Sequence, residues 1–472
     1  MTDEILINVG PREIRAALIE AERPVEVWHW RRDQTPLLGR IHLGRVTGLA
    51  PGADAAFVDF GGERAGFLSL RDDRLEEGQA VLVQVAKEPY ADKGASLTMD
   101  LSLPGRFLAL RPLQPGIALS RQIKDKAERA RLLALGESLA ESEGLAEIGG
   151  GFILRTAAEG ADEAALSAEA AALVERWRRL DREAGTARPP ALLYADDDPI
   201  RRCLREQCCP KVRRVLIDDG EALASARDYC TEMMPWAAER LARHTGAGAL
   251  FDLYDTEAEI EAALEPHLDL PSGGSIAIEA TEALTAIDVN AGRLAGGRDA
   301  AETALATNLE AAAEMARQLR LRAIGGLIVI DFIDMNAAGA VARLLAALDA
   351  ALARDRAPTR RSEMSAFGLV EMTRRRDREP LAARLTEPCP GCAGGRRPSA
   401  RAIAERALRL AAAEARRAPG GRIEDAAAPE VIADLGGEAG GRVEWLGRRL
   451  GCRLGLRATP ERGREAIDVY RP

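Results

Sequence analysis

The feature of this sequence that most constrains its fold is a pair of apolar segments that flank one long helical pattern. The segments, residues 284–290 and 326–334, are rich in isoleucine, leucine and valine, and they contain Asp288 and Asp331. Such runs are typical of strands buried on both faces, and a helix between them predicts a crossover that places the strands side by side. The sequence therefore predicts a strand–helix–strand unit with one carboxylate near the end of each strand.

Local signals support one long helix between these strands. Asp299 and Glu302 have the spacing of a capping box, and Gly325 with Gly326 follows the helical pattern as C-cap glycines do. Apolar residues recur at helical spacing between these signals: Ala304, Leu305, Leu309, Met315 and Leu319.

Two carboxylates held side by side can share one hard cation. Mg²⁺ takes few protein ligands and keeps water molecules for a phosphate substrate, so Asp288 and Asp331 with a helper amide such as Asn290 would suffice. This chemistry makes a phosphoryl-transfer enzyme the first hypothesis. The alternative is that Asp288 caps a turn and that Asp331 pairs with an arginine.

Composition sets the broad class of the protein. A chain of 472 residues allows about three domains or more at roughly 150 residues each. It contains no apolar run of about 18 residues, and its first residues lack the basic start of a secretory signal. Seven cysteines, an odd number without dense spacing, suit a reducing compartment. We therefore expect a cytoplasmic protein with no membrane association and no structural disulfide.

Charge and histidine content limit the chemistry further. The formal net charge is −9, yet arginines cluster at residues 201–205, 211–214, 317–322 and 374–378. Local basic patches can bind phosphates despite a net acidic charge. The four histidines follow no ligand or acid–base spacing, which favours metal-assisted chemistry over a histidine pair.

A small β-barrel is predicted where residues 39–85 alternate short strands with glycines. Phe57, Phe60 and Phe67 fall in this segment, and Lys93 follows it. Aromatic and basic side chains together can form a platform for single-stranded nucleic acid. Phe57 and Phe60 have opposite strand parity, so we expect one ring inside the barrel and the other outside. The alternative is that all three rings belong to the core.

A weaker phosphate signal lies between the barrel and the strand–helix–strand unit. Arg155 and Thr156 stand at the end of a predicted strand, and Arg121 lies upstream. A guanidinium fork and a hydroxyl can together hold a phosphate. By spacing alone this signal is weak.

Cys389 and Cys392 form a C-x-x-C knuckle, whose turn lets two thiolates share a tetrahedral metal. They supply only half of a site, because no second knuckle exists in the sequence. We favour one Zn²⁺ shared by two chains across a two-fold axis. The alternatives are a redox pair and a knuckle completed by a distant cysteine.

In this order the motifs resemble the ribonuclease E/G family over nearly the whole chain. The absence of a long polar tail makes the chain similar to the shorter members, without the scaffold that recruits degradosome partners. The resemblance is carried by the cysteine knuckle and by residues 150–160, 281–290, 308–311, 316–322, 326–335 and 367–374.

The resemblance implies a multidomain α/β fold, in which an S1-like OB-fold barrel is inserted into an RNase H-like fold that has no catalytic site of its own. The implied domains are RNase H-like (1–36 and 199–264), S1-like (37–103), a 5′-phosphate sensor region (104–198), DNase I-like and catalytic (265–385), a zinc-link (386–397) and a small α+β C-terminal domain (398–472).

The resemblance also implies a role for each candidate residue. Asp288 and Asp331 match Mg²⁺ ligands, and Asn290 matches the amide that helps orient the scissile phosphate, for cleavage that leaves a 5′-phosphate and a 3′-hydroxyl. The remaining matches are Arg155, Thr156, Arg121 and Gly105 in a pocket that senses a 5′-monophosphate, Phe57, Phe67 and Lys93 in RNA binding, and Cys389 and Cys392 in the Zn²⁺ link between protomers.

Three departures from the family pattern concern RNA binding and dimerisation. Residues 336–343, usually rich in charge, are mostly alanine and glycine here. Leu43 stands where the barrel often carries a lysine, and Arg396 follows the knuckle where glycine is usual. These departures bear on the strength of RNA binding and of dimerisation, and they leave the two aspartates unaffected.

The expected function is an endoribonuclease that cuts single-stranded, A/U-rich RNA, is stimulated by a 5′-monophosphate, and acts in rRNA processing and mRNA decay. The expected assembly is a homodimer through the shared zinc, with further pairing into a tetramer left open. The alternatives are a non-catalytic RNA-binding scaffold and a DNA nuclease.

Overall fold

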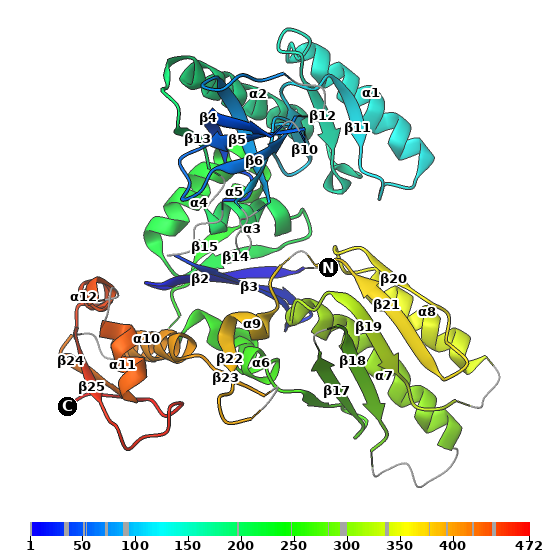
Figure 1. Ribbon diagram of the computed structural model, residues 1–472. Coiled ribbons are helices and arrows are strands. Elements are labelled where there is room, and N and C mark those ends of the chain that lie inside the picture. The colour runs from blue at the N-terminus through cyan, green and yellow to red at the C-terminus, as the bar shows by residue number, and fades with distance from the viewer. Residues whose placement is uncertain are drawn as a thin grey trace. The chain divides into compact units, whose positions relative to one another are not determined.

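The computed structural model divides into two compact units. Unit 1 comprises residues 1–32, 211–219 and 243–472, and unit 2 comprises residues 33–210 and 220–242. The elements of both units are labelled in Figure 1. The structure describes residues 2–32, 37–50, 52, 54–70, 74–87, 94–195, 198–246, 248–281, 283–292, 300–335, 339–376, 378–392, 395–417, 420–436 and 440–472.

The first sheet combines three strands from the N-terminal part of the chain with two strands from residues 214–243. β1 pairs parallel with β14 and antiparallel with β2, and β3 continues the meander, giving the order β15-β14-β1-β2-β3. The strands are β1 (Glu4–Val9), β2 (Glu13–Glu20), β3 (Arg23–Arg31), β14 (Arg214–Ile217) and β15 (Leu241–Arg243). The predicted blocks 1–36 and 199–264 thus contribute strands to one sheet, while the limits of the six predicted domains stay predictions.

The second sheet of unit 1 carries the two aspartates. Its order is β16-β17-β18-β19-β21-β20, and only the β18–β19 pair is parallel. The elements are β16 (His267–Asp269), β17 (Ser275–Ala280), β18 (Thr285–Asn290), α7 (Ala300–Leu321), β19 (Gly326–Asp331), α8 (Ala340–Leu352), β20 (Thr359–Arg361) and β21 (Leu369–Arg374). The predicted strand–helix–strand unit is confirmed; its capping residue Asp299 lies outside the described residues.

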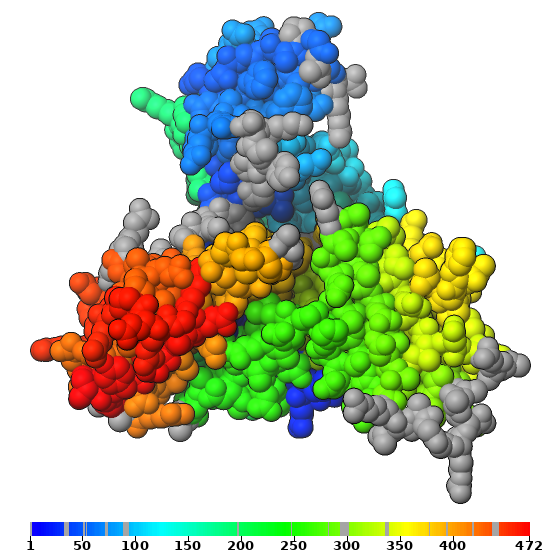
Figure 2. All heavy atoms as spheres, turned by 60° about the horizontal axis from the view of Figure 1, so that its bottom comes forward, coloured from blue at the N-terminus to red at the C-terminus, as the bar shows by residue number. Residues whose placement is uncertain are grey.

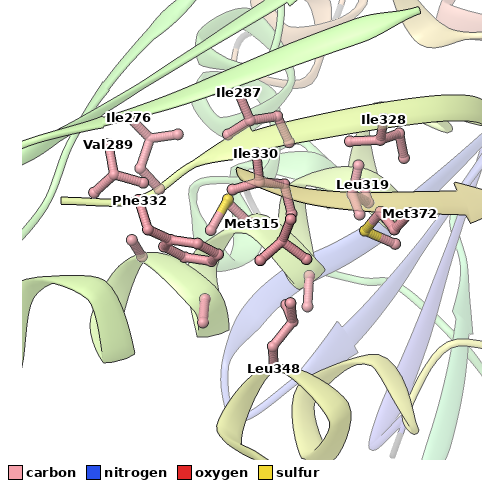
Figure 3. Packing of buried hydrophobic residues seen from close by; sticks show 14 of the residues in the cluster. Ile276, Ile287, Val289, Met315, Leu319, Ile328, Ile330, Phe332, Leu348 and Met372 are labelled. Atoms are coloured by element: carbon pink, nitrogen blue, oxygen red, sulfur yellow. The ribbon is translucent and has the colours of Figure 1, made fainter. Parts of the chain in front are cut away.

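One expectation about this sheet is wrong: its strands are buried on one face, not on both. Burial alternates along β18, where Ile287 and Val289 are buried and Asp288 is exposed. Figure 3 shows side chains of the buried face, including Ile287 and Ile330, gathered with Met315 of α7 and Leu348 of α8. Apart from β18–β19 the strand pairs are antiparallel, and such sheets commonly leave one face open to solvent.

Unit 1 ends in a hairpin and a small α+β segment. β22 and β23 pair antiparallel, and the last sheet has the order β25-β24-β26 against α10, as the ribbon shows (Figure 1). In Figure 2 the orange and red atoms of this C-terminal segment form one continuous surface. The remaining elements of unit 1 are η3 (Leu250–Asp255), α6 (Thr256–Ala262), α9 (Leu381–Leu385), β22 (Thr386–Pro388), β23 (Arg396–Pro398), α10 (Ala400–Arg417), β24 (Arg422–Ala427), α11 (Pro429–Gly436), α12 (Gly440–Leu450), β25 (Arg453–Ala458) and β26 (Asp468–Tyr470).

Unit 2 contains a closed five-stranded barrel, as the glycine-punctuated pattern predicts. The strands run β4-β5-β6-β8-β7, and β7 pairs back to β4; β13 adds to the outside of β4. Closure leaves no free edge between the first and last strands. The strands are β4 (Ile41–Ala50), β5 (Ala55–Asp59), β6 (Gly66–Ser69), β7 (Ala80–Lys87), β8 (Ser96–Thr98) and β13 (Ala191–Tyr194).

The rest of unit 2 is a small mixed sheet with helices. Its strand order is β11-β12-β10-β9. The helix α1 starts at a cap in which the Asp125 side chain accepts from the Glu128 backbone amide. The elements are β9 (Leu103–Pro104), β10 (Leu108–Arg111), β11 (Gly116–Leu119), α1 (Lys126–Ser142), β12 (Gly151–Leu154), η2 (Thr156–Ala158), α2 (Glu163–Thr186), α3 (Pro199–Gln207), α4 (Gly220–Met233) and α5 (Pro235–Ala238).

Among the described residues, no helix combines the length and the apolar character that a membrane span requires.

Candidate functional site

The two aspartates face each other across the parallel pair at the centre of the second sheet. Asp288 of β18 and Asp331 of β19 are partners in the register, and both are exposed on the open face of the sheet. Neighbouring strands lie about 5 Å apart, which lets two paired carboxylates reach one cation. The alternative in which Asp288 caps a turn is wrong, because Asp288 lies within a strand.

Asn290 joins this pair from the same strand and the same face. Its Nδ2 donates a hydrogen bond to Asp288 Oδ2 at 2.7 Å. An amide nitrogen carries two N–H groups, so the second one remains able to donate to a phosphate oxygen. The residues that the sequence groups by spacing are thus grouped in space as well.

No cation of the protein neutralises the pair within the part of the chain that the structure describes. Neither Asp288 nor Asp331 has an arginine, lysine or histidine within ion-pair distance there, so the alternative in which Asp331 pairs with an arginine finds no support. Like charges placed directly across two strands destabilise a sheet by up to about 1 kcal/mol. Stability therefore does not explain the pair, and its oxygen donors fit a hard divalent cation such as Mg²⁺.

Asn308 of α7 braces the loop that follows Asp331. It is fully buried, its Nδ2 donates to the Ile333 carbonyl at 2.8 Å, and its Oδ1 accepts from the Ile333 amide at 3.1 Å. Sequence reasoning misses this role. The available signal is position, because Asn308 lies four residues after Ala304 and so falls on the apolar stripe of the helix.

In unit 2, the barrel presents an aromatic pair. Phe57 and Phe67 are cross-strand partners that are 44 % and 39 % exposed, with ring centroids 6.2 Å apart and an interplanar angle of 74°. Phe60 is buried in the barrel core, as strand parity allows, so the alternative with all three rings in the core is wrong. Lys93 lies outside the described residues.

Arg155, Thr156 and Gly105 lie together in the small sheet region of unit 2. Arg155 Nη1 donates to the Gly105 carbonyl, and its guanidinium makes a two-point ion pair with Glu206 at 2.7 and 3.3 Å. Burial alone would raise the pKa of Glu206, but Arg155 and then Arg205 outweigh it and bring that pKa to about 2. Glu206 is therefore a carboxylate at any physiological pH and occupies the guanidinium fork.

The hydroxyl of this group is tied to the turn that precedes α1. Thr156 Oγ1 lies 2.8 Å from Ser120 Oγ and donates to Gln122 Oε1 at 3.1 Å. Arg121, between these two partners in sequence, is exposed.

Glu169 of α2 is a second residue that sequence reasoning misses. Its carboxylate is almost fully buried and accepts hydrogen bonds from the backbone amides of Arg106, Phe107 and Leu108. A Cβ on Gly105 would lie 2.7 Å from Glu169 Oε1, so only glycine fits at that position. Nothing in the local sequence connects two residues that lie so far apart along the chain.

Cys389 and Cys392 lie at the tip of the β22–β23 hairpin. Hydrogen bonds from the Gly391 backbone and the Cys392 side chain lower the pKa of the Cys389 thiol, which favours the thiolate that binds metal. A Cβ on Gly395 would lie 2.4 Å from Cys392 Sγ, so glycine keeps room for the sulfur there. No described histidine, cysteine or carboxylate completes a group of three with this pair.

The described residues contain one grouping of three possible metal ligands, Glu13, His29 and Glu405 in unit 1, and we attribute it to ion pairing. Arg409 donates to Glu13 at 2.6 Å, so a cation is already present. Burial and then the charge of Glu13 raise the pKa of Glu405 to about 7, so this carboxyl keeps its proton more readily than an exposed glutamate. A divalent ion would be repelled by Arg409 and by Arg15, which lies 3.6 Å from Glu13.

Comparison with known proteins places this geometry in context. A sequence model of the ribonuclease E/G family matches residues 102–377. Ribonuclease G of Escherichia coli is 37 % identical over 416 residues, 84 % of each chain, and ribonuclease G of Haemophilus influenzae is 37 % identical over 413 residues, 83 % of each chain. Ribonuclease E of a Nostoc species is 39 % identical over 378 residues, which cover 76 % of this chain and 54 % of that protein.

Proposed function

The chain belongs to the ribonuclease E/G family and is an endoribonuclease, and from this premise we propose that it cleaves single-stranded, A/U-rich RNA with Mg²⁺ held by Asp288 and Asp331. The main observation in support of the metal site is that the two exposed carboxylates, Asp288 and Asp331, lie directly opposite each other on parallel strands. We also propose a role in rRNA processing and mRNA decay. We propose a cytoplasmic location as well, and the seven unpaired cysteines support this location because free thiols persist in a reducing compartment.

The residues of the site divide the work of phosphodiester hydrolysis. A bound Mg²⁺ supplies positive charge to the phosphate and lowers the pKa of a coordinated water. Asp288 and Asp331 would hold the cation; Asn290 fixes the Asp288 carboxylate and would donate its second N–H to a phosphate oxygen. Water would attack phosphorus in line and lose a proton to solvent, the P–O3′ bond would break, and O3′ would take a proton from solvent, which would leave a 3′-hydroxyl and a 5′-phosphate.

Asp288→Asn and Asp331→Asn test the site directly. Loss of outer-shell partners of a metal already costs about 10- to 100-fold, so loss of a ligand should slow cleavage at least about 100-fold. The measurement is Mg²⁺-dependent cleavage of one A/U-rich RNA by variants that are folded by circular dichroism. Glu371→Gln is the matched control, because Glu371 is exposed on the neighbouring strand and pairs with Val329. Cleavage at the parental rate by either aspartate variant would sink the metal site.

The same assay separates the alternative functions. An RNA-binding scaffold would bind the RNA without Mg²⁺-dependent cleavage. A DNA nuclease would cut single-stranded DNA as readily as RNA, with no dependence on the 2′-hydroxyl.

The barrel supports the RNA-binding part of the proposal. Phe57 and Phe67 offer two exposed rings on adjacent strands, and stacking on aromatic side chains holds unpaired bases without demanding a particular sequence. Lys93 would add a contact to the RNA backbone.

Arg155, Thr156, Arg121 and Gly105 would form the sensor of a 5′-monophosphate. Glu206 and the Gly105 carbonyl fix the orientation of the Arg155 guanidinium, and a phosphate that binds there must share or displace the Glu206 carboxylate. The Thr156 hydroxyl lies next to Arg155 in sequence and is itself fixed by Ser120. Such a fork and hydroxyl suit a terminal phosphate.

Cys389 and Cys392 would bind half of a shared Zn²⁺. The hairpin supplies two thiols, and a tetrahedral zinc needs four ligands. Two copies of the hairpin related by a two-fold axis would complete the site and produce a homodimer.

A further inference from the structure

Phe367 is the most exposed large apolar side chain among the described residues. Its ring is 89 % exposed, whereas no other such side chain there exceeds 51 %. A ring left in water gives up the favourable burial that aromatic side chains normally obtain. Its position in the molecule therefore calls for an explanation.

Phe367 lies beside the two-aspartate site. It sits two residues before Leu369, the residue of β21 that pairs with Asp331. A Cβ on Gly368 would lie 3.8 Å from Asp334 Oδ1, so the turn also runs next to the loop that follows β19. Two Cα–Cα steps of about 3.8 Å and one strand spacing of about 5 Å place the Phe367 backbone within roughly 13 Å of that of Asp331.

The turn that carries Phe367 is rigidly built. Ser365 Oγ accepts from the amides of Phe367 and Leu369 at 3.3 Å, and the Ser365 amide donates to the Leu369 carbonyl at 2.8 Å. Gly368 has φ +80°, which favours glycine and turns the chain into β21. The ring is thus presented on a fixed support, which lowers the entropy lost when a ligand stacks on it.

We propose that the Phe367 ring stacks on an unpaired nucleobase of the RNA, one or two nucleotides from the phosphate held by Asp288 and Asp331. This inference rests on the proposed function. Among the described residues, the neighbours of Phe367 in this turn are small or polar, namely Ser365, Ala366 and Gly368, so the exposed ring stands alone there and not in the contiguous apolar patch that a protein partner would bury. Every base offers a π face, so stacking here positions the strand without reading its sequence.

Abasic scanning combined with substitution tests this contact. One abasic nucleotide is moved along a defined substrate around the cleavage site, and kcat/KM is measured for the parental protein and for Phe367→Ala. With the parental protein, one position should show a loss of about 5- to 150-fold, the range expected for one stacked base. With Phe367→Ala the intact RNA should already show that loss, and the abasic nucleotide at the same position should add nothing further.

Controls keep the outcome specific to stacking. Phe367→Trp and Phe367→Tyr should keep most of the parental rate, Phe367→Leu should not, and Leu327→Ala, an exposed apolar residue on the same sheet, should change nothing. Losses that add independently at every abasic position would overturn the inference while leaving the nuclease intact. A Phe367→Ala protein that cleaves normally but changes its oligomeric state by light scattering would also overturn it. Absence of cleavage by the parental protein would instead sink the proposed function.

Discussion

At the scale of single residues, the Arg155–Glu206 ion pair predicts competition for the sensor. A 5′-monophosphate must share or displace the Glu206 carboxylate, which stays charged because its pKa is about 2. Glu206→Gln removes this competing charge, so the ratio of cleavage rates for 5′-monophosphate and 5′-hydroxyl forms of one RNA should rise. Arg155→Lys loses the fork and should bring the ratio close to one, a loss of about tenfold or more for a charged hydrogen bond. Arg182→Lys, at an exposed position on α2, is the control. A lower ratio in Glu206→Gln would show that Glu206 supports phosphate binding.

Asp425 of β24 predicts a pH-dependent stability in the C-terminal segment. It is fully buried, neither of its carboxylate oxygens has a described hydrogen-bond partner, and burial raises its pKa from 3.8 to about 7. Because the folded state favours the protonated carboxyl, Asp425 adds its full contribution to the free energy of unfolding below about pH 4. This contribution is lost as the pH rises through about 7, a change of up to about 4 kcal/mol. Asp425→Asn should remove this dependence and slow hydrogen exchange in β24 at pH 8, after correction for intrinsic rates. Asp468→Asn, exposed on β26, should leave the pH dependence in place; an unchanged profile in Asp425→Asn would contradict the assignment.

At the scale of elements, α7 should act on catalysis through Asn308. Asn308→Ala leaves both backbone groups of the half-buried Ile333 without this partner, at a combined cost of up to about 1–3 kcal/mol. The loop after Asp331 should then lose its fixed position, so kcat should fall more than KM changes, and more Mg²⁺ should be needed for half-maximal rate. Glu302→Ala, exposed on the same helix, is the matched control. A lowered melting temperature with unchanged kinetics would assign Asn308 to stability alone.

The same elements show where sequence reasoning reaches and where it stops. The order of strand, helix and strand follows from local patterns, and with it the meeting of Asp288 and Asp331. Local patterns do not reveal that only one face of the sheet is buried, because this depends on where α7 and α8 pack and on the antiparallel neighbours of the parallel pair. Asn308 is hidden for a similar reason, since its partner is a backbone group that only the folded loop brings to it.

At the scale of the whole molecule, local sequence patterns do not predict contacts between segments that lie far apart along the chain. Glu169 organises a loop 61 to 63 residues earlier, and Glu206 holds Arg155 across 51 residues. The barrel is an intermediate case, because its strands and the opposite placement of Phe57 and Phe60 follow from alternation, while the choice of Phe57 as the outer ring and closure by the β4–β7 pair depend on the folded barrel. Sequence therefore yields candidate residues, and the fold adds the groups that hold them.

The hairpin with Cys389 and Cys392 leads to a prediction about zinc content and dimerisation. If two chains complete one tetrahedral site, the purified protein should contain half an equivalent of zinc per chain and behave as a dimer by light scattering. Replacing both Cys389 and Cys392 by serine, or treating the protein with a chelator, should remove the zinc and shift the protein towards monomer in parallel. Cys209→Ser, at a partly exposed position elsewhere in the chain, should change neither quantity. One full equivalent of zinc per chain would mean that each chain completes its own site, and the shared-zinc dimer would have to be abandoned.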